Sequence, residues 1–83
     1  MSNLVEQPAE IFILKWRGNH KPRTNRIQYS IRQEIDNRIK RGQIVFVMTE
    51  NEDIYEWRQW SMPVFTSWQE FMKQYRDYTF EVK

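Results

Sequence analysis

The feature that most restricts the fold of this sequence is a row of isoleucines spaced four residues apart: Ile27, Ile31, Ile35 and Ile39. At about 100° per residue, this spacing keeps the four side chains on one face of a helix. Thr24 or Asn25 can act as the N-cap, and Gly42 follows the last turn, as at many helix C-termini. The pattern predicts an amphipathic helix over residues 24–41, whose apolar face other elements must cover.

The elements around this helix are predicted from short apolar runs and one capping pattern. Four runs have strand composition or alternation and are too short for helices. They are IFILKW (11–16), QIVFVM (43–48), IYEWRQW (54–60) and TFEVK (79–83). Ser67 and Glu70 have the spacing of a capping box, which predicts a second helix over residues 67–78.

The resulting order, β-α-β-β-α-β, predicts a ferredoxin-like (split βαβ) α+β fold, in which two helices cover one face of a four-stranded antiparallel sheet. Residues 1–10 are mostly polar and contain Pro8, so we expect a flexible N-terminal arm. Residues 11–83 are expected to form a single domain.

Alternation along the strands predicts which residues face the helices. The set expected on the helix-covered side is Phe12, Leu14, Ile44, Phe46, Met48, Phe80 and Val82. The apolar residues left for the open side are Ile11, Ile13, Val45 and Val47. An exposed apolar face of this kind predicts a homodimer, and closure by the arm and loops is the alternative.

Composition limits the class of protein. The chain has no cysteine, so disulfides and thiolate metal sites are excluded, and a reducing compartment fits best. Its five Phe, four Tyr and four Trp (16%) supply the large side chains that a small core needs. No basic region precedes an apolar run at the N-terminus, and no apolar stretch is long enough to span a bilayer. These features predict a soluble, cytoplasmic protein with no membrane partner.

Charge is unevenly distributed along the chain. The net charge is only +2, but residues 15–42 hold nine basic and two acidic residues. Such asymmetry favours a polyanionic partner. In the helix, the isoleucine row places Arg26, Tyr29, Gln33 and Lys40 on the solvent side, where the tyrosine could stack on an unpaired base. An ordinary wet helix face with one stray tyrosine is the alternative.

The candidate nucleic-acid-binding residues are the bases of the 17–26 segment, those near the end of the helix, and the exposed tyrosine. They are Arg17, Lys21, Arg23, Arg26, Tyr29, Arg38, Lys40 and Arg41. Cations near a helix C-terminus are also favoured by the helix dipole, so Arg38, Lys40 and Arg41 have two explanations. Lys21, Arg23 and Arg26 lie at the other end, where this effect does not account for them.

The usual catalytic groups are missing. There is one histidine and no cysteine, so neither a histidine pair nor a thiol nucleophile is available, and we expect a non-enzymatic protein. The acidic residues Glu50, Glu52, Asp53 and Glu56 do not have the spacing of a calcium loop and are expected to form a solvated turn. We predict no metal and no cofactor. A small ribonuclease that works without a histidine pair is a minor alternative.

The aromatic residues Tyr55, Trp57 and Trp60 raise the possibility of an RNA-recognition motif, which stacks bases on aromatic residues of central strands. Neither IFILKW nor IYEWRQW contains the glycine-rich aromatic consensus of that family. We therefore expect Trp57 and Trp60 in the core or in a dimer interface.

The length, the absence of cysteine, the aromatic content and the basic helix RIQYSIRQEIDNRIKRG make this chain similar to small accessory and anti-defence proteins of T-even-type phages. These include TifA-like, RNA-dependent inhibitors of ribonuclease toxins. The resemblance implies an inhibitor that binds RNA together with a host target protein.

The leading hypothesis is a non-enzymatic nucleic-acid-binding protein that contacts phosphates, of RNA in preference to DNA, through the 17–26 loop and the first helix. The alternative is an inhibitor of a host protein that docks its basic face on an acidic or nucleic-acid-binding surface and does not bind nucleic acid itself. Salt dependence of binding to unrelated RNA and DNA separates the two.

Overall fold

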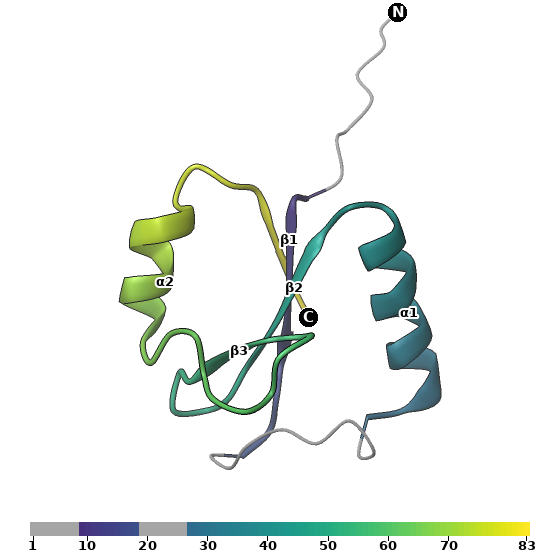
Figure 1. Ribbon diagram of the computed structural model, residues 1–83, viewed down its shortest axis with the longest axis horizontal. Helices are drawn as coiled ribbons and strands as arrows, with labels where there is room; N and C mark the ends of the chain where they lie inside the picture. Colours follow the sequence, from purple (N-terminus) through teal and green to yellow (C-terminus); the bar gives the residue numbers. More distant parts are fainter. Residues whose placement is uncertain (1–8, 19–26) are drawn as a thin grey trace, which may run out of the picture.

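The computed structural model describes residues 9–18 and 27–83 (Figure 1). The order of elements is the predicted β-α-β-β-α-β. The bounds are β1 (Ile11–Lys15), α1 (Tyr29–Lys40), β2 (Ile44–Met48), β3 (Ile54–Glu56), α2 (Trp68–Tyr75) and β4 (Phe80–Val82). Each predicted strand and helix is therefore present, and each is shorter than its sequence pattern.

The four strands form one mixed sheet in the order β3-β2-β1-β4. β1 is parallel to both β2 and β4, and only β3 runs antiparallel to its neighbour β2. The predicted antiparallel, ferredoxin-like sheet is wrong, because β1 pairs directly with β2 and no strand is inserted into the first βαβ unit. A helical crossover returns the chain parallel to the strand it left, but the order of elements does not say whether another strand lies between.

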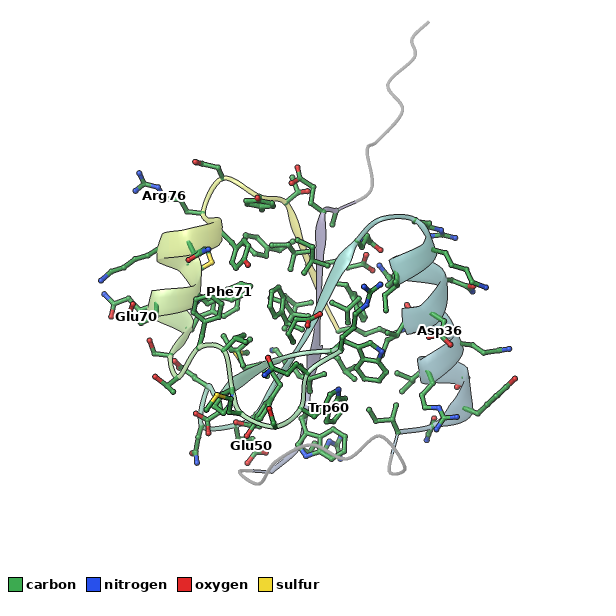
Figure 2. The ribbon with its side chains drawn as sticks, viewed as in Figure 1. Asp36, Glu50, Trp60, Glu70, Phe71 and Arg76 are labelled. Carbon is green, nitrogen blue, oxygen red and sulfur yellow. The ribbon has the colours of Figure 1, made fainter. Side chains whose placement is uncertain are left out.

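The two helices lie on opposite faces of the sheet, which Figure 1 shows nearly edge-on between them. Phe12, Leu14, Val45 and Val47 form a buried cluster with Ile27 and Ile35 on the α1 side. Ile11, Ile13, Phe46 and Ile54 form a second cluster with Phe71 of α2, whose side chain points toward the sheet in Figure 2. The prediction of two helices on one face is therefore wrong, and the domain has three layers.

The predicted face assignment mixed the two sides. In the parallel register Phe12 is opposite Val45 and Ile13 is opposite Phe46, so the members of each pair share a face. Alternation within each strand was correct, but alternation does not set the phase of one strand relative to the next. Ile11 and Ile13 are completely buried under α2. The apolar open face that suggested a homodimer does not exist in the part of the chain that the structure describes.

Helix α1 ends as predicted but begins later. Gly42 has φ +89°, a left-handed conformation that favours glycine. Its N–H donates to the Ile39 carbonyl (2.9 Å), and the Gln43 N–H donates to the Arg38 carbonyl (3.0 Å), which together form a Schellman motif. At the other end Gln28 is the N-cap and gives no side-chain hydrogen bond, so the helix does not start near residue 24. The predicted caps Thr24 and Asn25 lie outside the described residues.

Helix α2 begins at the predicted cap. The Ser67 hydroxyl accepts a hydrogen bond from the Glu70 N–H (3.1 Å). A second acceptor comes from the turn between β2 and β3, where Glu52 Oε1 accepts from the Trp68 N–H (2.9 Å). The acidic turn is therefore not only solvated: one of its carboxylates caps the second helix, where negative charge is favourable.

The chain before β1 is anchored from Ala9 onward. The Glu10 N–H donates to the Thr79 hydroxyl and carbonyl, and the Gln43 side chain donates to the Ala9 carbonyl. The rest of the predicted arm, residues 1–8, lies outside the described residues. None of the helices formed by residues 9–18 and 27–83 is long and apolar enough to cross a membrane.

Candidate nucleic-acid interface

The outer face of α1 carries the exposed aromatic residue predicted from the isoleucine spacing. Ile35 is fully buried, whereas Tyr29, on the other side of the helix, is 68% exposed. Its hydroxyl accepts a hydrogen bond from Gln33 Nε2 (3.1 Å). The ring is therefore held by its neighbour one turn along the helix while its faces remain open to solvent. Arg26, which was predicted beside it, lies outside the described residues.

Two cations occupy the C-terminal end of the same helix. Lys40 and Arg41 are exposed, and neither forms an ion pair with another described residue. Lys40 lies eleven residues after Tyr29, about three turns, and therefore returns to nearly the same face about 16 Å away along the axis. Within residues 9–18 and 27–83, both cations are therefore available to an anion.

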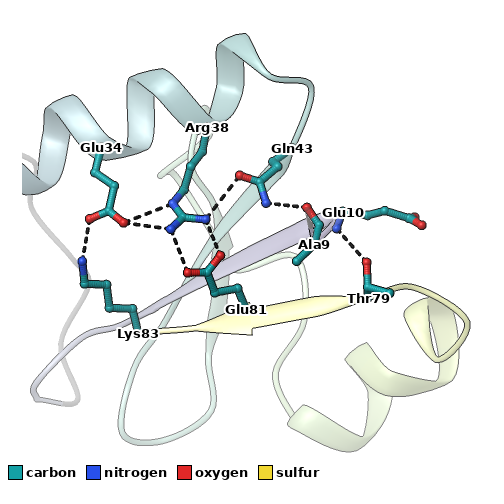
Figure 3. A network of polar contacts seen from close by, with 8 residues as sticks. All are labelled: Ala9, Glu10, Glu34, Arg38, Gln43, Thr79, Glu81 and Lys83. Atoms are coloured by element: carbon teal, nitrogen blue, oxygen red, sulfur yellow. Dashed lines mark hydrogen bonds and ion pairs between the residues drawn. The ribbon is translucent and has the colours of Figure 1, made fainter. Parts of the chain in front are cut away.

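Arg38 has a different environment from these neighbours (Figure 3). Its guanidinium forms two hydrogen bonds to the Glu81 carboxylate, Nη1 to Oε1 (2.5 Å) and Nη2 to Oε2 (2.8 Å). Nη2 and Nε also donate to Glu34 Oε2, at 2.9 and 3.2 Å. The guanidinium carbon lies 4.1 Å from the centre of the Phe12 ring, and the side chain is only 13% exposed. Arg38 joins α1 to β4 and is not on the outer face.

The same network perturbs the ionisation of its members. Hydrogen bonds from Lys83 and then from Arg38 lower the pKa of Glu34, and the Arg38 hydrogen bond lowers the pKa of Glu81. The Glu81 hydrogen bond raises the pKa of Arg38. Lys83 Nζ lies 2.7 Å from Glu34 Oε1, which completes a network of four residues joined by three ion pairs. Because these charges neutralise one another, we leave Arg38 out of the proposed interface.

The remaining candidates lie in or near the segment between β1 and α1. Arg17 is exposed and lies two residues after the end of β1, which is a central strand of the sheet. It forms no ion pair with another described residue. Lys21 and Arg23, like Arg26, lie outside the described residues. Of the eight predicted residues, the structure therefore places Arg17, Tyr29, Lys40 and Arg41 on the surface without ion pairs to described residues.

A polar groove borders this surface. It has a volume of about 360 Å³ and runs along the flank of α1, where Arg38 and Glu34 form its inner wall. The other lining residues are Ser30, Gln33, Asn37 and Arg41. The groove thus places neutral hydrogen-bonding groups between the exposed tyrosine and the C-terminal cations.

Sequence analysis missed one basic residue of this helix. Arg32 is exposed, has no ion pair with a described residue, and lies three positions after Tyr29. Residues three apart are neighbours on a helix surface, so the spacing could have indicated it. Asp36 points outward on the same helix in Figure 2, so the outer face is basic but not exclusively so.

The aromatic residues of β3 and of the segment after it pack in or against the core. Tyr55 is 7% exposed, and Trp57 and Trp60 pack against the α1-side cluster with their rings edge to face, 5.2 Å between centres. The Trp60 ring N–H donates to the Trp57 carbonyl. Trp57 and Trp60 therefore pack against the core, as one of the two interpretations predicted, and both remain partly buried. Among the described residues, no group of three or more His, Cys, Asp or Glu side chains could hold a metal ion.

No protein-family model, curated protein or solved structure matches this chain. The interpretation of the α1 surface therefore depends on its own residues.

Proposed function

We propose that this chain is a non-enzymatic, cytoplasmic nucleic-acid-binding protein that uses the outer face of α1 and prefers RNA to DNA. The observation that carries the proposal is the exposure of Tyr29, 68%, on a helix whose Lys40 and Arg41 have no ion pair with a described residue. A large ring left in solvent is well suited to stack on an unpaired base. Free cations beyond it can neutralise phosphates of the same strand.

The polar groove supports RNA over DNA. Ser30, Gln33 and Asn37 offer neutral donors and acceptors beside the cations. A ribose 2′-hydroxyl both donates and accepts hydrogen bonds, and this group lets a protein distinguish RNA from DNA. An RNA strand whose phosphates are bound by the cations could therefore form hydrogen bonds in this groove through its 2′-hydroxyls, and a DNA strand could not.

The segment before α1 extends the proposed surface. From their position in the sequence alone, we include Lys21, Arg23 and Arg26 in this surface, because they precede the end of α1 that carries Tyr29. The resemblance to phage accessory proteins adds a host target protein held together with the RNA. The alternative function is docking of this basic face on an acidic protein surface without nucleic acid. It also depends on the basic residues, but it involves neither stacking on a base nor hydrogen bonds to a ribose.

Binding across a salt series tests the proposal. We expect a single-stranded RNA to bind more tightly than DNA of the same sequence, with log affinity falling linearly against log salt between about 50 and 200 mM. Arg41→Ala should reduce the steepness of this line by about 0.7, the value for one phosphate contact on a single strand. Arg76→Ala is the matched control, since this exposed arginine follows α2 on the opposite side of the sheet.

Two results would contradict the proposal. One is the absence of binding to any nucleic acid at about 50 mM salt, where phosphate contacts are strong. The other is an equal loss of steepness in the Arg41 and Arg76 variants, since the charge effect would then not belong to α1. The first result would favour the protein-docking alternative, and the second would place nucleic-acid binding on a surface other than α1.

A further inference from the structure

The two edges of the sheet differ in how they are closed. At the β3 edge, the Ile54 N–H donates to the Phe65 carbonyl and the Val64 N–H donates to the Ile54 carbonyl, both at 2.8 Å. Gln59, which follows β3, also forms a β-bridge with Glu56 of that strand. At the other edge, β4 pairs with β1, and no other described strand lies beyond it. One edge is thus covered by its own chain, while the other offers backbone groups for pairing.

Along β4, the backbone N–H and C=O groups of successive residues point alternately toward β1 and away from the sheet. The Ile11 N–H donates to the Thr79 carbonyl (3.0 Å), and the Lys83 N–H donates to the Ile13 carbonyl (2.9 Å). Residues 79, 81 and 83 therefore direct their backbone groups toward β1. Because the direction alternates along a strand, the N–H and C=O groups of Phe80 and Val82 point away from the sheet.

The charged side chains of β4 do not protect this edge. Natural edges are often kept from pairing by unneutralised charges, especially lysines. Here Glu81 is bound by Arg38, and Lys83 is bound by Glu34, so both charges are already satisfied on the α1 side (Figure 3). The Thr79 hydroxyl accepts from the Glu10 N–H (2.9 Å). A strand added here would bury no unpaired charge of β4.

The opposite side of the strand is apolar. Phe80 and Val82 of β4, and Tyr78 two residues before it, alternate with Thr79, Glu81 and Lys83, and Tyr78 and Val82 are 39% and 45% exposed. Next to Val82 lies a hollow of about 360 Å³. Its lining residues are Lys15, Met48, Glu52, Trp68 and Val82. An added strand would thus meet an apolar row and a partly aromatic hollow on the α2 side.

We propose that β4 pairs with β4 of a second copy of this chain, antiparallel and edge to edge, to give one continuous eight-stranded sheet. A second copy fits because its edge supplies the same apolar row and the same neutralised charges, as an isologous interface requires. This surface is distinct from the open face that the sequence suggested, which α2 covers.

Charge selects the register of the two strands. With a two-fold axis between the strands at Glu81, the two Glu81 carboxylates would be directly opposite, and like charges in that position are destabilising. With the axis at Phe80, Glu81 is opposite the partner's Thr79, and Val82 is opposite the partner's Tyr78. The second register joins the exposed apolar residues and separates the carboxylates, so we assign it to the dimer.

The symmetry also places the helices. A two-fold axis perpendicular to an antiparallel pair leaves both copies of α1 on one face of the joined sheet and both copies of α2 on the other. If the proposed function is correct, the two basic surfaces then lie side by side and bind one strand with greater avidity. The dimer itself does not depend on that function, because its test uses protein alone.

Sedimentation analysis of the protein without nucleic acid tests the dimer. A short edge buries less than the roughly 1,200 Å² of a standard interface, so we expect a dimer with a dissociation constant on the order of 10–100 µM. Val82→Pro removes an outward N–H that β1 does not use and should shift the protein to monomer by more than tenfold in this constant. Val82→Thr keeps that N–H and the branched shape and should change the constant less than fivefold.

Two results of this experiment would overturn the proposed dimer. A monomeric mass for the unchanged protein at several hundred micromolar would overturn the proposal, and so would a Val82→Pro variant that remains fully dimeric. If Val82→Pro fails to fold by circular dichroism, Val82→Lys replaces it, since an added charge in the apolar row should also give monomer.

Cross-linking tests the register. The chain has no cysteine, so a protein with Tyr78→Cys and Val82→Cys holds only the introduced thiols. Residues opposite each other in such a pair have Cα atoms about 5.5 Å apart, within the range of a disulfide. We expect mild oxidation to give a covalent dimer much faster than for Met62→Cys, at a residue 62% exposed elsewhere on the surface. Equal rates for the two proteins would exclude this register.

Discussion

The two flanks of α1 show how neighbouring basic residues acquire different roles. Arg38 and Lys40 are two residues apart, which turns their side chains by about 200° around the helix. Arg38 meets Glu34, Glu81 and the Phe12 ring and is 13% exposed, whereas Lys40 is exposed and forms no ion pair with a described residue. The inner flank joins α1 to β4, and the cation of the outer face has no ion pair among the described residues.

The difference lies in what each cation has beside it. Glu81 is separated from Arg38 by 43 residues along the chain, and it reaches the arginine only because β4 lies next to β1 in the sheet. No acidic residue from another described element reaches Lys40 or Arg41. Basic residues of one sequence cluster therefore cannot be assigned to a binding surface as a group.

The largest expected effect comes from removing the inner cation. Arg38→Met keeps the aliphatic stem over Phe12 but leaves Glu81 without its partner. We expect the free energy of unfolding to fall by about 2–3 kcal/mol, because the variant loses the hydrogen bonds between the guanidinium and two carboxylates, although Glu81, 46% exposed, regains water. Urea unfolding monitored by tryptophan fluorescence measures the change.

The matched control for that experiment is Lys40→Met. It removes a cation from the same helix at an exposed site, and we expect a change within about 0.5 kcal/mol. Equal losses of stability in the two variants would mean that the network in Figure 3 does not distinguish the flanks.

The next effect concerns the exposed aromatic residue. Tyr29→Ala should weaken binding to single-stranded RNA by about 1–3 kcal/mol, the usual range for one base stacked on a ring. Tyr29→Phe keeps the ring and loses only the hydrogen bond with Gln33, so most of the affinity should remain. Fluorescence anisotropy at one salt concentration measures both variants, and equal affinities for Ala and Phe would argue against stacking.

A smaller effect is expected from acid. The folded protein holds the pKa of Glu34 and Glu81 below the ordinary value of 4.5, through hydrogen bonds from Lys83 and Arg38. The stability that these carboxylates contribute is therefore fully present above about pH 4.5 and is lost as the pH falls through their lowered pKa values. Urea unfolding at a series of pH values should show this decline.

Substitution identifies the carboxylates responsible. The double variant Glu34→Gln and Glu81→Gln should be less stable at neutral pH and should decline less steeply in acid. Glu70→Gln, which removes a carboxylate in an exposed pair with Lys73 at 3.7 Å, should leave the decline nearly unchanged. A decline that stays equally steep in the double variant would assign the acid sensitivity to other groups.

Several features of the fold and of the candidate site could be predicted from sequence because they depend on local spacing. The isoleucine row placed Ile35 inward and Tyr29 outward, and the structure confirms both. Gly42 ends α1 and Ser67 begins α2. In each case the relevant contacts lie within one or two turns of the chain, so helical periodicity and capping chemistry were sufficient.

The arrangement of these elements in space depends on contacts between distant segments, which the local sequence patterns do not determine. Strand alternation is the same whether β1 pairs with β2 or is separated from it, and the apolar residues on both sides of β1 fit a sheet covered once or twice. The choice came from contacts between distant segments, such as Phe71 of α2 against Phe46 (5.0 Å between ring centres). The role of Arg38 likewise depended on where β4 lies. Sequence by itself determined the elements, their ends and their apolar sides, because these follow from local geometry. Tertiary structure decided which faces are covered and which cations lack an ion pair in the described part of the chain, because both depend on long-range packing.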